Sequence, residues 1–403
     1  MGGRSDSKKG AKEGGERDEE AVGIADNGRG DLIAPMPPTT DTPILTTGLA
    51  AHIARAIEAA GGWLGFDQFM ALALYTPGLG YYANDSRKFG LMPGTGSDFV
   101  TAPELSPRFG QALARQAAQA LEATGTREIW EFGAGSGALA QQVLEVLGLR
   151  LERYTIVDLS GSLQARQRER LAAYGDKVRW VAELPAAMRG VVLGNEVLDA
   201  MPVKLLARLQ GVWHERGVVV HDGGLLYADK PGALRPPFEV EGTHDYLTEI
   251  HPQAEAFVAT LADRLEAGAV FLLDYGFPEH EYYHPQRSMG TVMCHRGHLA
   301  DTDALAEVGS KDITAHVNFT GIALAGQEAG LEVLGYTSQG RFLLNCGLVD
   351  GMEDAPLEQR VMEQKLVAEH EMGELFKVIA FGAKGGPAWE PMGFATGDRT
   401  HTL

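Results

Sequence analysis

The sequence predicts an α/β fold in which helices flank a doubly wound β-sheet. Beyond residue 127, short and nearly continuous apolar runs alternate with helical stretches, a pattern typical of buried parallel strands joined by helices. Directly after the first run lies a glycine-rich turn with the spacing G-x-G-x-G, which opens a helix. Ligands of such folds bind at the carboxyl ends of the strands, so the turn predicts a ligand there.

The N-terminal part of the chain precedes this alternation. Residues 1–43 contain almost no apolar residue that could offset the entropy of ordering, so we predict a disordered tail. A helical extension is expected at 44–108, where apolar residues recur at helical spacing and a second apolar segment covers 66–75. A loop rich in Gly, Pro, Ser and Asp then continues to Pro107, and loops of this length are usually functional.

The main domain is predicted at residues 109–350, and an amphipathic helix opens it. The runs that we predict as buried parallel strands are 128–132, 154–159, 178–181, 191–194 and 269–275, and the helical stretches between them are 138–147, 162–173 and 254–266. Residues 204–229 depart from this pattern, because they alternate like a hairpin and contain glycine turns. We therefore predict a β insertion, at about 204–250, between the fourth and fifth core strands.

The C-terminal part has weaker patterns. We expect residues 332–348 to form two strands about Gly340-Arg341. Residues 351–403 are expected to hold a polar helix, near 357–376, followed by a frayed tail.

Composition and charge exclude several classes of function. The 54 Asp and Glu outnumber the 35 Lys and Arg, and the resulting formal charge of −19 repels a phosphate backbone, so no nucleic-acid partner is expected. No apolar run approaches the ~20 residues that a membrane-spanning helix needs, so no membrane insertion is expected. Two cysteines, Cys294 and Cys346, provide neither a disulfide framework nor a metal cluster. We expect no metal site and a location in the reducing cytoplasm.

The glycine-rich turn is the most informative motif. It places Gly133, Gly135 and Gly137 directly after Glu131 and Phe132, where the backbone can approach a ligand closely. A nicotinamide dinucleotide site usually has the spacing G-x-G-x-x-G, and an acid just before the glycines is poorly placed against a pyrophosphate. S-adenosylmethionine instead carries a cationic sulfonium and an ammonium group. Glu131 and the spacing therefore favour S-adenosylmethionine as the cofactor.

Two further polar residues follow predicted strands at the same edge. Asp158 ends the second strand, where its carboxylate can accept both hydroxyls of a ribose, a role that would serve NAD equally well. Asn195 follows the fourth strand and is placed to bond either the amino-acid end of the cofactor or the substrate. We predict both as cofactor-binding residues, together with the three glycines and Glu131.

With these residues in place, the chain resembles the MidA family of class I S-adenosylmethionine-dependent methyltransferases, which is related to a mitochondrial complex I assembly factor. The matching blocks are PGLGYY at 77–82, DFVTAPE at 98–104, EFGAGSG at 131–137, NEVLDAMPV at 195–203, LDYG at 273–276 and DITAHVNF at 312–319. Three positions depart from the family pattern: Asp158 stands where Glu is frequent, Ser97 where Gly is usual, and Ser136 where Arg is frequent.

The resemblance implies a Rossmann-like class I methyltransferase sheet with the N-terminal helical extension and the β insertion. It also implies methyl transfer to a protein arginine, with a respiratory complex I subunit as the acceptor in the mitochondrial relative. Two alternatives stay open. One is N- or O-methylation of a small molecule, for which an enclosed pocket of about 300–1,000 Å³ would be expected. The other is a cofactor-binding assembly chaperone for a respiratory complex.

An arginine acceptor needs carboxylates that hold its planar cationic fork. Glu196 and Asp199 directly follow the fourth strand, and we predict both as catalytic, with Glu196 first and helix capping as the alternative role. Asp98, Thr101 and Glu104 lie in the long early loop, which we predict to cover the cofactor as a lid and to contribute to the substrate pocket.

His316 lies in the last of the matching blocks. It is a candidate proton acceptor. A structural role is more common for a lone histidine, so the predicted catalytic set leaves it out.

Overall fold

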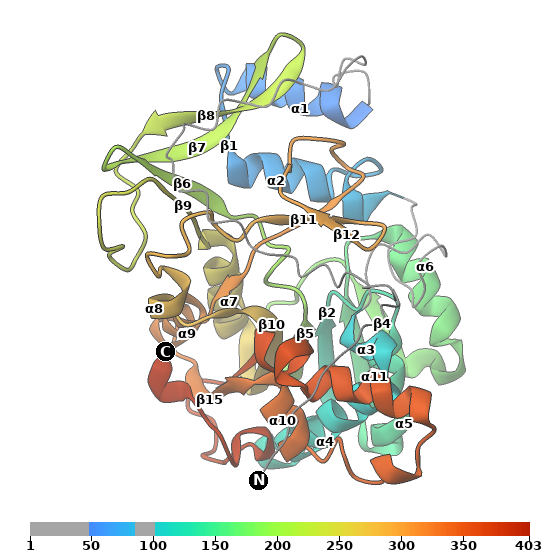
Figure 1. The fold of residues 1–403 in the computed structure, drawn as a ribbon. Coiled ribbons are helices and arrows are strands. Elements are labelled where there is room, and N and C mark those ends of the chain that lie inside the picture. The colour runs from blue at the N-terminus through green and yellow to red at the C-terminus, as the bar shows by residue number, and fades with distance from the viewer. Residues whose placement is uncertain (1–47, 85–100) are drawn as a thin grey trace, which may run out of the picture. The chain divides into compact units, whose positions relative to one another are not determined.

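The computed structural model describes residues 48–84 and 101–403 (Figure 1). The tail predicted at 1–43 and the lid residue Asp98 lie outside the described residues.

A mixed sheet of eight strands forms the centre of the fold. Its strands follow the order β15-β16-β10-β5-β2-β3-β4, with β14 beside β10. Their bounds are β2 (Glu128–Phe132), β3 (Arg153–Val157), β4 (Val178–Val181), β5 (Met188–Asn195), β10 (Leu265–Phe277), β14 (Val317–Asn318), β15 (Glu332–Ser338) and β16 (Phe376–Gly382). Strands β2, β3, β4, β5 and β10 are parallel, whereas β16 is antiparallel to both of its neighbours. The chain winds from β2 outward to β4 and then returns to β5 on the other side of β2, which confirms the doubly wound α/β fold.

Helices cover both faces of this sheet because alternate strand residues point to opposite faces. Val191 and Leu193 pack with α4 (Pro107–Thr124) and α5 (Ala138–Leu147). Val192 packs with α7 (Pro252–Arg264) and α9 (Phe319–Glu328). Further helices are α3 (Ala102–Leu105), α6 (Gly161–Arg170), α8 (Glu279–Tyr282), α10 (Gln339–Asn345) and α11 (Leu357–Val367). None of the helices in the part of the chain that the structure describes could cross a membrane.

The chain between β5 and β10 forms a second sheet, so the predicted β insertion is confirmed. Its strands are β6 (Lys204–Leu209), β7 (Val212–His221), β8 (Gly224–Pro231) and β9 (Tyr246–Ile250), joined by the short β1 (Leu64–Gly65). The N-terminal helices α1 (Gly48–Ala59) and α2 (Phe66–Tyr75) pack against it through a shared apolar cluster. A small sheet of β11 (Met293–Arg296), β12 (Leu299–Asp301) and β13 (Asp312–Thr314) lies between this insertion and the central sheet (Figure 1).

The C-terminal part differs from the prediction. Only the first half of 332–348 is a strand, because Phe342, Leu343 and Cys346 recur at helical spacing and are buried in the core on α10. The predicted helix near 357–376 ends at Val367.

The last segment is also more ordered than predicted. The apolar run Phe376–Gly382 is a fully buried strand between β10 and β15. Beyond it, the Arg399 N–H donates to the Tyr336 carbonyl at 2.6 Å, and Asp398 accepts from the Tyr336 N–H at 3.1 Å. Residues 397–402 therefore pack on β15 instead of fraying.

Candidate functional site

A cavity of about 1180 Å³ lies at the carboxyl ends of β2, β3, β5 and β10. The glycine turn and the residues that follow β3 and β5 form one group of its lining residues. A second group comes from α2 and its following turn, from β13 and from the ends of β10 and β16. The cavity is therefore at the edge of the sheet where the chain order reverses, which is where ligands bind in such folds.

The glycine turn brings the backbone close to the cavity. Gly133, Gly135 and Gly137 have φ angles of 62°, 52° and 80°, in the left-handed region that favours glycine. A Cβ at Gly133 would lie 3.0 Å from a side-chain methyl of Val197. Gly137 precedes the first residue of α5, so free N–H groups of that helix start beside the turn.

Glu131 lies on β2 and lines the cavity, although it is only 2% exposed. Its Oε2 accepts the hydroxyl of Tyr154 at 2.7 Å. Burial raises the pKa of Glu131 to about 8. A cationic ligand beside this carboxyl group would favour its charged form.

Asp158 comes directly after β3 and is held from two sides. Its Oδ1 accepts the N–H of Ser160, and its Oδ2 accepts the amide of Gln167, both at 2.8 Å. Burial raises its pKa above the ordinary value. Each carboxylate oxygen can accept a further hydrogen bond, so this fixed group retains capacity for a diol in the cavity.

Asn195 and Glu196 end β5. The Asn195 Nδ2 donates to Glu196 Oε1 at 2.9 Å, while the Asn195 Oδ1 is buried without a hydrogen-bond partner among the described residues. Glu196 has a φ of 55°, an unusual value for a residue with a side chain, and its carboxylate also accepts the N–H of Ala102. Burial raises the pKa of Glu196 to about 8. Glu196 thus joins β5 to α3.

Asp274 holds the loop that follows Glu196. Its Oδ2 accepts the N–H groups of Val197, Leu198 and Asp199 at 3.1, 2.9 and 3.1 Å. Sequence reasoning assigned no role to Asp274, although a charged residue at the end of an apolar strand was a usable signal.

Asp199 is 6% exposed and faces the second group of lining residues. Its Oδ2 accepts the hydroxyl of Tyr275 at 2.6 Å, and its Oδ1 is buried without a partner in the described structure. Burial raises the pKa of Asp199 to about 6. The cavity therefore contains a buried carboxylate oxygen that accepts no hydrogen bond from the described residues.

Aromatic side chains surround this carboxylate. Tyr75 and Tyr82 stack with ring centroids 5.7 Å apart, and the Tyr75 hydroxyl donates to the Ala200 carbonyl at 2.7 Å. The Tyr82 hydroxyl donates to Asp312 on β13 at 2.8 Å. We call Tyr75, Tyr82, Asp199, Tyr275 and Asp312 the acceptor pocket. Tyr82 and Asp312 lie in matching blocks but were not predicted as site residues.

Two of the three predicted lid residues are described. Thr101 lines the cavity just before α3. Glu104 on α3 accepts a hydrogen bond from Ser136 in the glycine turn and pairs with Arg170 at 3.1 Å. The structure thus brings α3 against the glycine turn.

Acidic residues dominate the charged residue types that line the cavity. Among the described residues that line it, the carboxylates are Glu131, Asp158, Glu196, Asp199 and Asp312, and none of these lining residues is Lys or Arg. No cluster suited to a metal ion occurs within 48–84 and 101–403. The arrangement favours cationic ligands.

Comparison with known proteins agrees with this chemistry. Over residues 112–337 the chain matches the model of a family described as S-adenosyl-L-methionine-dependent methyltransferases. It is 26% identical to the Danio rerio "Protein arginine methyltransferase NDUFAF7, mitochondrial", a match that covers 82% of this chain and 85% of that protein. It is also 26% identical to the Homo sapiens protein of the same name, over 83% of each chain.

Two crystal structures of Burkholderia thailandensis proteins are more similar. The first, described as a COG1565 superfamily member bound to S-adenosyl-homocysteine, is 48% identical with a TM-score of 0.85 and covers 91% of this chain and 100% of that chain. The second, without that ligand in its description, is 47% identical with a TM-score of 0.81 over the same shares.

The prediction of a cytoplasmic location is wrong on this comparison, because the curated relatives are named mitochondrial. The prediction depended on the cysteines, both of which are buried and unpaired. Such cysteines indicate a reducing compartment but do not identify which one.

Proposed function

Because the chain belongs to the family of S-adenosyl-L-methionine-dependent methyltransferases, we propose that it transfers a methyl group to an arginine side chain of a protein. The cofactor, S-adenosyl-L-methionine, supplies a methyl group on a cationic sulfonium. The names of the curated relatives support a protein arginine as the acceptor. The observation that carries the proposal is the Oδ1 of Asp199, which is buried and accepts no hydrogen bond from any residue in 48–84 or 101–403.

The residues around the glycine turn suit the cofactor. Asn195 Oδ1 is buried and has no partner in the described part of the chain, so it offers an acceptor to the ammonium group of the cofactor. Asp158 is fixed by two donors and keeps capacity for the ribose hydroxyls. Glu131 lines the cavity beside the turn, and a bound cation would favour its charged form. We assign cofactor binding to these three residues and to the three glycines.

Asp199 is the residue that we assign to the guanidinium. A guanidinium group has five N–H donors and no acceptor, so it complements a carboxylate oxygen that has no donor of its own. A buried carboxylate without a partner costs free energy, and a bound cation removes that cost. A neutral hydroxyl acceptor would leave the charge of Asp199 uncompensated.

The shape of the acceptor pocket also suits a planar cation. The stacked rings of Tyr75 and Tyr82 provide flat aromatic surface beside Asp312. A guanidinium stacks on such surface and is attracted to the negative face of the ring. The pocket therefore combines planar walls with negative charge.

The role of these groups is to orient the acceptor. Methyl transfer is an in-line displacement, and the nucleophile must be held about 3–3.5 Å from the methyl carbon. Asp199 is itself oriented by Tyr275 and by the loop that Asp274 holds. Glu196 already contacts Asn195 and Ala102, so we place Asp199 first and Glu196 second as the carboxylates that hold the guanidinium. Thr101 and Glu104 stay predicted lid residues that contribute to the substrate pocket.

The test identifies the methylated residue directly. Purified enzyme and isotopically labelled S-adenosylmethionine are added to lysate from a strain that lacks the gene, and mass spectrometry locates the label. We expect methylarginine in one protein or a few proteins. We predict a respiratory complex I subunit as the methylated protein. The same mass spectra show whether the labelled protein is such a subunit. Label found only on lysine, or only on a small molecule, would contradict the proposal.

A matched pair of variants makes this test specific. Asp199→Asn keeps the shape of the side chain and removes its charge, so labelling should fall. Asp222→Asn is the control, because Asp222 lies on the turn between β7 and β8 with a side chain that is 91% exposed. Equal labelling by both variants would contradict the role of Asp199.

A further inference from the structure

His316 lies between β13 and β14 and lines the cavity. Its ring packs edge-on against Tyr275, with centroids 5.1 Å apart, and against Phe277, with centroids 5.3 Å apart. Its backbone N–H donates to Thr291 at 3.1 Å, and its carbonyl accepts from His251 at 2.8 Å. Both the backbone and the ring of His316 are thus held in place beside the acceptor pocket.

The two ring nitrogens of His316 differ in their surroundings. Nδ1 is buried and has no hydrogen-bond partner among the described residues. Because Nδ1 is buried and His316 lines the cavity, we infer that Nε2 is the nitrogen that meets a ligand there. A neutral imidazole has one nitrogen with a proton and one with a free electron pair, so Nε2 can act as an acceptor when Nδ1 carries the proton.

Two cations lie near enough to this histidine to act on its charge. The guanidinium of Arg287 stacks on Phe277 at 3.8 Å, and the Lys377 ammonium is 5.9 Å from the same ring. Burial, these two cations and His251 lower the pKa of His316 to about 4. The imidazole is therefore neutral at pH 7, and its electron pair is available.

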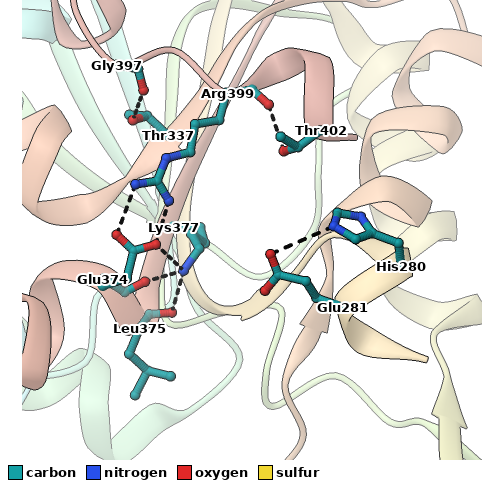
Figure 2. A network of polar contacts seen from close by, with 9 residues as sticks. All are labelled: His280, Glu281, Thr337, Glu374, Leu375, Lys377, Gly397, Arg399 and Thr402. Carbon is teal, nitrogen blue, oxygen red and sulfur yellow. Dashed lines mark hydrogen bonds and ion pairs between the residues drawn. The ribbon is translucent and has the colours of Figure 1, made fainter. Parts of the chain in front are cut away.

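The position of Lys377 is fixed by the segment that leads into β16. Figure 2 shows Lys377 and Arg399 converging on Glu374. Lys377 is 5% exposed and donates to the backbone carbonyls of Glu374 and Leu375. One carboxylate thus pairs with both cations.

We propose that His316 accepts, through Nε2, the proton that the acceptor nitrogen loses during methylation. The proposal rests on the proposed arginine acceptor. The acceptor nitrogen forms a bond to the methyl carbon with its electron pair, the carbon–sulfur bond breaks with its electrons left on sulfur, and the N–H proton passes to Nε2. Arg287 and Lys377 disfavour the imidazolium, so the proton then passes to water.

This assignment separates two tasks in the site. Asp199 holds the guanidinium by its charge, and it would lose that hold if it took the proton itself. A neutral imidazole takes the proton without neutralising the carboxylate. His316 is in this way suited to the proton transfer, and Asp199 to orientation.

The first experiment measures turnover of a pool of arginine-containing peptides by the full chain. His316→Gly should lower kcat by about 10²-fold or more and change KM for the peptides less than about threefold, since a general base acts on the chemical step. Added imidazole should restore part of the rate. His280→Gly is the control: His280 is exposed on α8, so this variant should keep the wild-type rate with or without imidazole.

The second experiment needs no cofactor and no turnover. Ring NMR of the ¹³C-histidine-labelled protein, with the His316 signal identified from His316→Gln, should show a neutral ring down to about pH 5. Adding N-ethylguanidinium should shift this signal in the wild type and not in Asp199→Asn, because binding of the cation requires Asp199.

The outcomes are distinguishable. If the wild type methylates none of the peptides, the proposed function fails and this inference fails with it. If the wild type methylates them and His316→Gly keeps the full rate, or loses rate that imidazole does not restore, only the role of His316 is overturned. The role of His316 is also overturned if calorimetry detects binding of N-ethylguanidinium and the NMR signal of His316 does not shift.

Discussion

Replacing Asp199 with Asn should stabilise the protein and inactivate it at the same time. The folded-state pKa of about 6 lies above the ordinary value of 3.8, so the folded state holds a proton more tightly than the unfolded state does. For a raised carboxyl pKa, stability falls as the pH rises through that interval and stays low above it. The charged side chain therefore lowers the stability of the wild type at pH 7, and an Asn at this position has no charge to bury.

The effect on activity has the opposite sign. A charge-assisted hydrogen bond contributes about 1.5–3 kcal/mol, so losing it in the transition state should lower kcat/KM for the acceptor by about 10–10²-fold. Affinity for S-adenosylmethionine should stay unchanged, because Asp199 is not among the residues assigned to the cofactor.

Urea denaturation of the wild type and Asp199→Asn at pH 5 and pH 8, together with calorimetry and a transfer assay, checks both statements. The unfolding midpoint of the variant should exceed that of the wild type, with a larger gap at pH 8. A lower midpoint at pH 8 would refute the argument from burial, and full turnover would refute the assignment of the guanidinium to Asp199.

Three more expectations follow from the cavity. Gly133→Val should abolish binding of S-adenosylmethionine in calorimetry, because φ is 62° and a side chain there would press on Val197, 3.0 Å away; retained micromolar binding would contradict this. Asp158→Ala should weaken cofactor binding by about tenfold or more and alter acceptor KM little, as steady-state kinetics would report, since it loses a charge-assisted bond to the ribose. Binding of N-ethylguanidinium should tighten from pH 5 to pH 8, because a cation lowers the raised pKa values of Asp199 and Glu196 and so releases protons, which calorimetry in two buffers of different ionisation enthalpy detects; equal heats in both buffers would argue against it.

The sequence was sufficient to predict the core strands, because buried parallel strands are continuous apolar runs. It was also sufficient for the insertion, whose hairpin alternation has a different period. It failed at residues 376–382, a run of the same apolar kind that was assigned to the end of a polar helix and to a frayed tail after it. The helix at 339–345 was mistaken for a strand because a seven-residue helix contains only two turns of periodic signal.

The site was predictable where a residue follows a strand. The position of Asn195, Glu196 and Asp199 at the cavity was expected in this way, since the ends of parallel strands meet at one edge, and their roles stay predictions. Tyr82 follows α2 in the N-terminal part of the chain, and Asp312 lies on β13. Only the tertiary fold brings them to the same cavity. No local pattern in the sequence reports such a meeting.

The loop that Asp274 holds by three N–H groups has a consequence for the thermodynamics of binding. Fixing the backbone of one residue costs about 1–2 kcal/mol of conformational entropy, and residues 197–199 are fixed by these bonds within the chain itself. The entropy of this loop is therefore lost when the protein folds and not when the acceptor arrives. The acceptor then binds to a loop that is already ordered. Its binding free energy therefore includes no cost for ordering residues 197–199.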